Sequence, residues 1–356
     1  MSQTRQRIRF LRASDAAQLA WAEAGEGPLL VKASNWMSHL EYEWQSPLWR
    51  HWIQFFSDHF RFVRYDERGC GLSDREPPLV SVDRWAADLE EVCEVVRHPG
   101  EPFLLLGISQ GAFACIHYAV RHPERVSHMI LYGGYARGYL KRGNPDAARE
   151  YRAIVEAIRV GWGKDNPSFR QLFTSRFIPE GTAEQLAWFN ELCRKTVAPS
   201  MAADLLQLRG EIDIVRLLSQ VRVPALVIHA ADDNVISVAE GRLIASSIPG
   251  AQFVELDSKN HILLEHEPAW TRFQEAVLEF TGAAPAHDGD AFTSLSPRER
   301  EVLALLSEGL DNTQIAGRLS ISEKTVRNHV SSVYDKLGVW SRAQAVVFAR
   351  EHGFRG

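Results

Sequence analysis

"PFLLLGISQG", residues 102–111, runs from an apolar segment into a turn that holds a serine between two glycines. A short, continuous apolar run that ends at glycine predicts a buried strand. Gly-x-Ser-x-Gly between a strand and a helix is typical of a nucleophile elbow, where a side chain at position 107 or 111 would crowd a strained turn. Ser109 is therefore a candidate nucleophile, although glycine and serine also cluster in ordinary loops.

Two later loops carry the groups that a nucleophilic serine needs. "ALVIHA" at 225–230 leads into Asp232 and Asp233, and "DSKNHILLEHEP" at 257–268 places His261 after the last apolar run. An imidazole can take the proton of the hydroxyl group, and a carboxylate can hold the ring and stabilise its charge. These residue types predict acyl-transfer chemistry if the loops meet at one site.

Short apolar runs alternate with helical patterns before residue 281. The runs that we expect to be strands are 28–34, 60–66, 102–108, 126–134, 224–230 and 251–257. Apolar strands separated by helices predict an α/β fold, with a mostly parallel sheet covered on both faces. Residues 137–218 interrupt the alternation with helical, aromatic-rich sequence, which predicts a helical lid. Its aromatic residues suit either a helix core or the roof of a mostly apolar pocket.

Four motifs in this order resemble the α/β-hydrolase superfamily over residues 20–280. They are the serine turn, "YDERGCGLSD" at 65–74, the acid loop, and "NHILLEHEP" at 260–268. The resemblance implies the α/β-hydrolase fold, and serine, acid, histidine is the family's chain order.

The resemblance also implies the catalytic triad Ser109, Asp233 and His261. In this family the acid lies three residues after the glycine that ends its strand, and Ala230 stands in that place here. We therefore choose Asp233 over Asp232. The other histidines, His229 and His266 included, are expected to be surface or packing residues.

One segment departs from the family pattern. "VKASNWMSH" at 31–39 replaces the His-Gly that supplies part of the oxyanion hole in most members. A hole could still form from the backbone N–H of Gln110 and that of Asn35 or Trp36. The departure favours slow turnover, and it leaves open an inherited fold whose chemistry has lapsed.

The C-terminal sequence "ISEKTVRNHVSSVYDKLGV" at 321–339 predicts an amphipathic helix. Ser322 is a good N-cap, and four apolar residues repeat at helical spacing: Val326, Val330, Val333 and Leu337. The opposite face carries Lys324, Arg327, Asn328 and Ser331. Arginine prefers guanine and asparagine prefers adenine in the major groove, so this face suits base reading. A generic helical bundle with a solvated polar face is the alternative.

Residues 295–353 resemble the LuxR-type helix-turn-helix domain, through "SPREREVL", "IAGRL", "ISEKTVRNHV", "KLGV" and "SRAQAV". The resemblance implies a small all-α domain of four helices that binds double-stranded DNA. Thr325, His329 and Lys336 match positions that often contact phosphates. From residue 293 onward 9 Lys and Arg face 7 Asp and Glu, a net charge of +2. So weak a positive charge favours two copies per DNA site, and we expect a homodimer.

Composition restricts the remaining possibilities. The length of 356 residues suits one large and one small domain, and a hydrophobic content of 45% is that of a globular protein. The net charge of −5 argues weakly against nucleic-acid binding by the chain as a whole, but the C-terminal part is positive. No apolar run reaches the roughly 18 residues that cross a bilayer, and the N-terminus lacks the apolar core of a signal peptide. The four cysteines are scattered without a CxxC pair. We expect a cytoplasmic protein with reduced thiols, no metal, no cofactor and no membrane contact.

These observations predict three segments. Residues 1–282 form an α/β-hydrolase-like ligand-sensing domain with its lid at about 137–218. The Pro/Gly-bearing, acidic segment 283–292 is a linker, and 293–356 form the DNA-binding domain. The favoured hypothesis is a transcription regulator whose hydrolase-like domain binds, and slowly hydrolyses, a small apolar ligand. The alternative is an active esterase-type serine hydrolase whose tail localises or regulates it.

Overall fold

The computed structural model describes residues 5–283, 292, 295–337, 339, 341–351 and 354. The chain divides into two compact units, Met1–Ala283 and Ala284–Gly356, and each is described by itself. The predicted linker 283–292 lies outside the described residues except at its two ends. None of the helices in the described ranges is both long and apolar enough to cross a membrane.

The first unit is built on an eight-stranded sheet in the order β1-β2-β4-β3-β5-β6-β7-β8. The strands are β1 (Arg7–Arg12), β2 (Gln18–Ala24), β3 (Leu29–Lys32), β4 (Arg61–Tyr65), β5 (Phe103–Ile108), β6 (Val126–Tyr132), β7 (Ala225–Ala230) and β8 (Gln252–Leu256). The pairs β1–β2 and β2–β4 are antiparallel, and every other pair is parallel. This confirms the predicted α/β fold with a mostly parallel sheet, to which β1 and β2 add an antiparallel edge.

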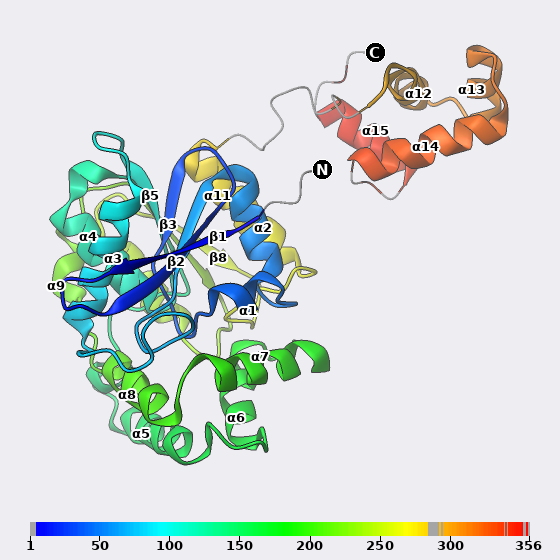
Figure 1. The fold of residues 1–356 in the computed structure, drawn as a ribbon. Helices are drawn as coiled ribbons and strands as arrows, with labels where there is room; N and C mark the ends of the chain where they lie inside the picture. Colours follow the sequence, from blue (N-terminus) through cyan, green and yellow to red (C-terminus); the bar gives the residue numbers. More distant parts are fainter. Residues whose placement is uncertain are drawn as a thin grey trace. The chain divides into compact units, whose positions relative to one another are not determined.

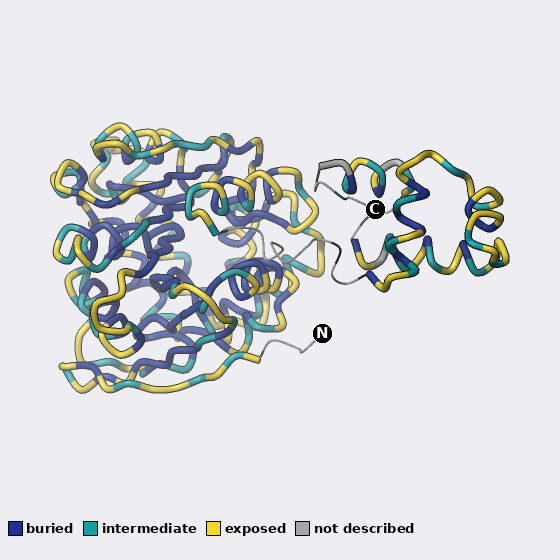
Figure 2. The backbone as a smooth tube through the Cα atoms, turned by 90° about the horizontal axis from the view of Figure 1, so that it is seen from above, coloured by how far each residue is buried: buried dark blue, intermediate teal, exposed yellow. Residues whose placement is uncertain are grey.

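Helices cover both faces of this sheet, as Figure 1 shows. The helices of this unit outside the insertion are α1 (Leu40–Trp44), α2 (Arg50–His59), α3 (Val82–Val96), α4 (Gly111–Arg121), η1 (Pro123–Arg125), α10 (Val238–Ser247) and α11 (Pro268–Thr281). On one face Trp52 of α2 packs against Phe273 of α11, with ring centroids 4.8 Å apart. Helices α3 and α4 lie on the other face, and Figure 2 shows that buried residues concentrate between the layers. The sheet is thus enclosed, which suits strands as apolar as β5.

The helical insertion, residues 137–218, lies between β6 and β7. It contains η2 (Tyr139–Lys141), α5 (Pro145–Gly161), α6 (Ser168–Phe177), α7 (Ala183–Thr196), α8 (Pro199–Gly210) and α9 (Val215–Leu218). Figure 1 shows α5, α6, α7 and α8 gathered together beside the sheet. Trp162 is fully buried and donates its indole N–H to the carbonyl of Cys193, at 3.0 Å. Some of the aromatic residues therefore form the insertion's own core, while others face a cavity.

The second unit contains four described helices: α12 (Pro297–Ser307), α13 (Asn312–Leu319), α14 (Glu323–Leu337) and α15 (Arg342–Glu351). Two capping boxes begin this unit's first helices, Ser296 with Glu299 for α12 and Asp311 with Gln314 for α13. The predicted apolar stripe of α14 is buried, at Val326, Val330, Val333 and Leu337. These helices confirm the predicted small all-α domain.

Candidate active site and DNA-binding helix

Ser109 occupies the sharp turn between β5 and α4. Its φ of 54° is left-handed, a conformation that costs a non-glycine residue about 1–2 kcal/mol. Its N–H donates to the carbonyl of Tyr132 at the end of β6, at 2.8 Å. A Cβ at Gly107 would lie 2.7 Å from the Cα of Ala112, so only glycine fits before the serine. These are the features of a strand–turn–helix elbow.

Asp233 and His261 meet on the loops after β7 and β8. Nδ1 of His261 lies 2.6 Å from Oδ2 of Asp233, and both side chains are buried. The other carboxylate oxygen accepts the N–H groups of Val235 and Ile236, at 2.7 and 2.9 Å. Burial would raise the pKa of Asp233, but the charge and hydrogen bond of His261 outweigh it and leave that pKa below its ordinary value. The acid is therefore ionised and fixed against the ring.

The loop that carries His261 is held from several sides. Glu267 accepts the hydroxyl of Ser258 at 2.6 Å, and that hydroxyl oxygen accepts the N–H of Asn260 at 3.0 Å. The backbone N–H of His261 donates to the carbonyl of Phe177, the last residue of α6, at 2.8 Å. The imidazole position thus depends on both the histidine loop and the helical insertion.

Two glycines after β6 lie between the serine turn and the imidazole. A Cβ at Gly133 would lie 3.0 Å from Cε1 of His261, and one at Gly134 would lie 3.5 Å from the carbonyl oxygen of Ser109. Nε2 of His261 is buried and has no hydrogen-bond partner among the described residues, Ser109 included. The structure therefore brings Asp233 and His261 into contact and leaves Ser109 nearby but unbonded to the ring, a gap that hydrolases often close only with ligand bound.

The residues expected at the oxyanion hole divide into two groups. Gln110, the N-cap residue of α4, and Trp36 line the same cavity as Ser109. Asn35 is buried beside Trp36, where its side chain accepts a hydrogen bond from the Lys32 ammonium group and donates to the Trp36 carbonyl, at 3.3 Å. These contacts involve the Asn35 side chain and leave the backbone N–H groups of both Asn35 and Trp36 as candidates for the second donor.

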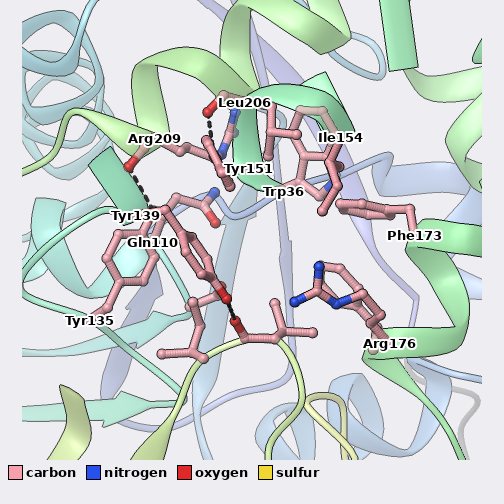
Figure 3. A pocket seen from close by; sticks show the side chains of 14 residues that line it. Trp36, Gln110, Tyr135, Tyr139, Tyr151, Ile154, Phe173, Arg176, Leu206 and Arg209 are labelled. Carbon is pink, nitrogen blue, oxygen red and sulfur yellow. Dashed lines mark hydrogen bonds between the residues drawn. The ribbon is translucent and has the colours of Figure 1, made fainter. Parts of the chain in front are cut away.

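Ser109 opens onto a cavity of about 70 Å³ beneath the helical insertion (Figure 3). The cavity is lined by Trp36, Ser109, Gln110, Tyr135, Tyr139, Tyr151, Ile154, Phe173, Arg176, Phe177, Leu206, Arg209, Val235 and Ile236. Most of these residues are aromatic or aliphatic, which suits a small, largely apolar ligand. The two arginines were not anticipated, because isolated charged residues in helical sequence usually face solvent.

His229 supports the acid loop. It is fully buried at the end of β7, and its Nε2 lies 2.8 Å from the Ile236 carbonyl and 3.7 Å from Oδ2 of Asp233. Burial lowers the pKa of His229, so the neutral ring can donate to that carbonyl. The residue was expected to be a surface or packing residue, and it packs directly behind the acid of the candidate triad.

Helix α14 presents its polar face away from the core of the second unit. Ser322 accepts the N–H of Thr325 at 3.1 Å, which begins the helix as predicted. The exposed predicted DNA contacts are Lys324, Arg327, Asn328, Ser331 and Lys336, and the half-buried ones are Thr325 and His329. A row of exposed polar side chains on one helix suits entry into a major groove.

Lys336 is engaged within its own unit. Its ammonium group lies 2.6 Å from Oε2 of Glu299, the residue that completes the capping box of α12. Burial would raise the pKa of Glu299, but hydrogen bonds from Lys336, Ser332 and Ser296 outweigh it and lower that pKa to about 2. A phosphate contact by Lys336 would therefore have to compete with this ion pair.

Comparison with known proteins matches both units separately. Residues 293–349 match the luxR family of bacterial regulatory proteins, and residues 51–269, more than half of the chain, match the family described as serine aminopeptidase, S33. The DNA-binding transcriptional activator DevR/DosR of Mycobacterium tuberculosis is 52% identical over 75 residues, 21% of this chain and 34% of the activator. The chain thus matches only about a third of that activator.

The first unit resembles proteins that are named as enzymes. 3-Oxoadipate enol-lactonase 2 of Acinetobacter baylyi is 24% identical over 274 residues, 76% of this chain and 96% of the lactonase. The crystal structure of a hydrolase from Pseudomonas aeruginosa shares the fold with a TM-score of 0.64 and 25% identity, over 77% of this chain and 98% of the hydrolase. The chain therefore belongs to the serine aminopeptidase S33 family of α/β hydrolases, and its C-terminal unit is a LuxR-type DNA-binding domain.

Proposed function

We propose that this protein is a transcription regulator whose hydrolase-like domain binds a small, largely apolar ligand and thereby changes its affinity for promoter DNA. The observation that carries this proposal is an aromatic cavity above Ser109 in the same chain as a LuxR-type domain. A metabolic hydrolase has little use for a DNA-reading domain, whereas a regulator needs a ligand pocket. In this proposal residues 1–282 sense the ligand, 283–292 link the domains, and 293–356 bind DNA.

A ligand can change DNA affinity only through a difference in its affinity for two conformations. The helical insertion supplies most of the cavity wall, including Tyr151, Phe173 and Leu206. It also holds the backbone of His261 through Phe177. A ligand in the cavity therefore touches a part of the fold that can differ between two states.

Helix α14 reads the bases in this proposal. Lys324, Arg327, Asn328 and Ser331 contact the major groove. Thr325, His329 and Lys336 contact the flanking phosphates. The chain acts as a homodimer on two half-sites, because one C-terminal domain neutralises few phosphates. Its place of action in this proposal is the cytoplasm.

The decisive experiment combines DNA binding with turnover. The preferred DNA site is selected from random duplexes with the full chain, and its Kd is measured while p-nitrophenyl esters and their product acids are titrated. The regulator proposal predicts a ligand-dependent change in Kd of about fivefold or more, typical of allosteric coupling. It fails if no ligand changes the Kd while simple esters turn over at ordinary rates, about 10 per second.

The second candidate function is an active esterase-type serine hydrolase. The 2.6 Å contact between Asp233 and His261 and the strained backbone of Ser109 favour it, since both features serve nucleophilic attack. Under this alternative the backbone N–H groups of Gln110 and of Trp36 or Asn35 stabilise the oxyanion. Ser109→Ala separates the two functions: a variant that still switches DNA affinity shows that chemistry is not part of signalling.

A further inference from the structure

Arg209, at the end of α8, is a buried charge in the wall of the cavity. Its exposed fraction is 4%, and it lines the cavity together with Ser109. Its Nη2 group donates to both carboxylate oxygens of Glu67, at 2.6 Å to Oε1. Its Nε and Nη1 groups are buried and have no hydrogen-bond partner among the described residues. An ionised group with unmet donors in an apolar wall is costly unless something accepts from it.

Two tryptophans surround this guanidinium group. Its Cζ lies 4.6 Å from the ring centroid of Trp36 and 4.9 Å from that of Trp85. Aromatic faces attract a cation, and they fix the plane of the guanidinium group, but they accept no conventional hydrogen bond. The side chain is therefore held in one orientation while two of its nitrogens stay unmatched.

Arg176 supplies a second cation to the same cavity. Figure 3 shows its guanidinium group pointing toward the centre of the cavity, on a different side from Arg209. The Arg176 side chain donates to the Asn234 carbonyl at 3.1 Å, and its nearest carboxylate, that of Glu150, is 3.8 Å away and 70% exposed. No Asp or Glu occurs among the described residues that line the cavity.

In the described part of the chain, the lining of the cavity carries two cations and no carboxylate. The buried carboxylates nearby are already engaged, Glu67 with Arg209 and Asp233 with His261. Glu150 is exposed, so solvent screens its charge. A ligand carboxylate can therefore accept from the unmet donors of Arg209 without a carboxylate of this described lining to compete for them.

We propose that the ligand of this cavity is a carboxylic acid, or an ester or lactone that carries a separate carboxylate, with an apolar body. The carboxylate accepts a hydrogen bond from Nε or from Nη1 of Arg209, whose N–H bonds point in different directions, and interacts with Arg176. The apolar body packs against aromatic residues such as Phe173 and Tyr151. This inference rests on the proposed function, because it names the chemical class of the ligand that the regulator senses.

The experiment compares matched ligands on the full chain by isothermal titration calorimetry at pH 8. The probes are phenylacetate and 4-phenylbutyrate, their neutral primary amides, and benzyl phosphate as a dianion. Arg209→Lys keeps a charge for Glu67 but removes the two unmet donors. The double variant Glu67→Gln, Arg209→Gln replaces the ion pair with an uncharged pair. Arg159→Lys on the exposed side of α5 is the control, since it does not line the cavity.

We expect at least one carboxylate to bind the wild-type chain about tenfold or more tightly than its amide, the usual worth of a charged hydrogen bond. Both Arg209 variants should lose this preference while amide affinity changes little, and Arg159→Lys should retain it. Equal affinity for acid and amide in the wild-type chain overturns the proposal, as does tighter binding of benzyl phosphate. Absence of carboxylate binding up to about 10 mM, or a preference that survives in a folded Arg209 variant, also overturns it.

The wild-type comparison decides the question even if neither variant folds. These binding measurements contain no DNA, so a failure of this inference can be distinguished from a failure of the proposed function. A chain that prefers carboxylates but never changes its DNA affinity contradicts the regulator proposal and leaves this inference standing. A chain whose DNA affinity responds only to neutral amides supports the regulator proposal and contradicts this inference.

Discussion

Nδ1 of His261 lies 2.6 Å from Oδ2 of Asp233, while the other ring nitrogen has no hydrogen-bond partner among the described residues. A buried carboxylate on Nδ1 holds the proton there and leaves Nε2 as an acceptor for a hydroxyl proton. The ring is thus prepared to act as a base toward Ser109 if the two approach.

Asp233→Asn tests this preparation. The amide cannot stabilise an imidazolium ion, so the rate at which a fluorophosphonate probe labels Ser109 should fall about 10³-fold or more. The rate is measured by intact-protein mass spectrometry over time. Asp232→Asn is the matched control, because this neighbour is exposed and forms neither a hydrogen bond nor an ion pair with His261 in the described part of the chain. An equal effect of the two substitutions would remove Asp233 from its proposed role.

Ser109→Gly should be more stable than Ser109→Ala. A φ of 54° is unfavourable for any residue with a Cβ. The glycine variant should therefore have a free energy of unfolding about 1 kcal/mol higher than the alanine variant, although glycine usually loses more backbone entropy on folding. Urea unfolding followed by tryptophan fluorescence gives both values. At exposed Ser219, where φ is −70°, the glycine variant should be no more stable than the alanine variant. The same order at both sites would contradict strain at Ser109.

Arg327→Ala should weaken binding to the preferred duplex by about 1–3 kcal/mol and relax the preference at one base pair. The arginine is exposed on the polar face of α14, where a bidentate contact with guanine is possible. Arg327→Lys keeps the positive charge but not the paired N–H donors of the guanidinium group. This variant should therefore preserve the salt dependence of DNA binding and still lose the base preference. Fluorescence anisotropy on a panel of single-base variants measures both effects. Unchanged affinity and preference in both variants would exclude Arg327 from base reading.

The Glu299 network should make the second unit sensitive to acid. The pKa of Glu299 falls from its ordinary 4.5 to about 2 in the folded state, so its contribution is complete above pH 4.5 and is lost as the pH falls toward 2. Glu299→Gln should cost about 1–3 kcal/mol at pH 7. Hydrogen exchange of α12 and α14 in the full chain should show a wild-type advantage that shrinks between pH 5 and pH 3. A constant advantage over that range would contradict the assignment.

Sedimentation equilibrium should give a dimer mass at micromolar concentration, and titration should give two protomers per palindromic DNA site. The low charge of the C-terminal domain motivates this prediction, and α15 offers an apolar surface that includes Val347, 52% exposed. Val347→Asp should weaken the dimer if α15 contributes to the contact. A monomer mass together with one-to-one DNA binding would argue against the homodimer.

Local patterns predicted the fold because its elements are individually strong. β5 is apolar throughout, and α14 carries a regular buried stripe, so each was recognisable without its neighbours. Neither β1 nor β2 was predicted. β1, "RIRFLR", is an edge strand with mostly exposed positions, and β2, "QLAWAEA", is rich in alanine, which is depleted in strands. An edge strand depends on pairing with β2, and such pairing leaves little signal in its own composition.

The candidate site was only partly predictable for a similar reason. Asp233 was chosen over Asp232 because the resemblance to the α/β-hydrolase family implies an acid three residues after the end of its strand, and the structure places Asp233 against His261. The pairing of Arg209 with Glu67 joins positions 142 residues apart. No periodicity or spacing links such residues, because their contact is created by how the insertion folds over the sheet.

The hydrogen bond from the His261 N–H to the Phe177 carbonyl has a consequence for measurement. It ties the candidate base to the last residue of α6, so a displacement of that helix must either move the imidazole or break the bond. The labelling rate of Ser109 therefore reports the position of the helical insertion. A compound that changes this labelling rate without contacting Ser109 would reveal a conformational signal before any promoter is known.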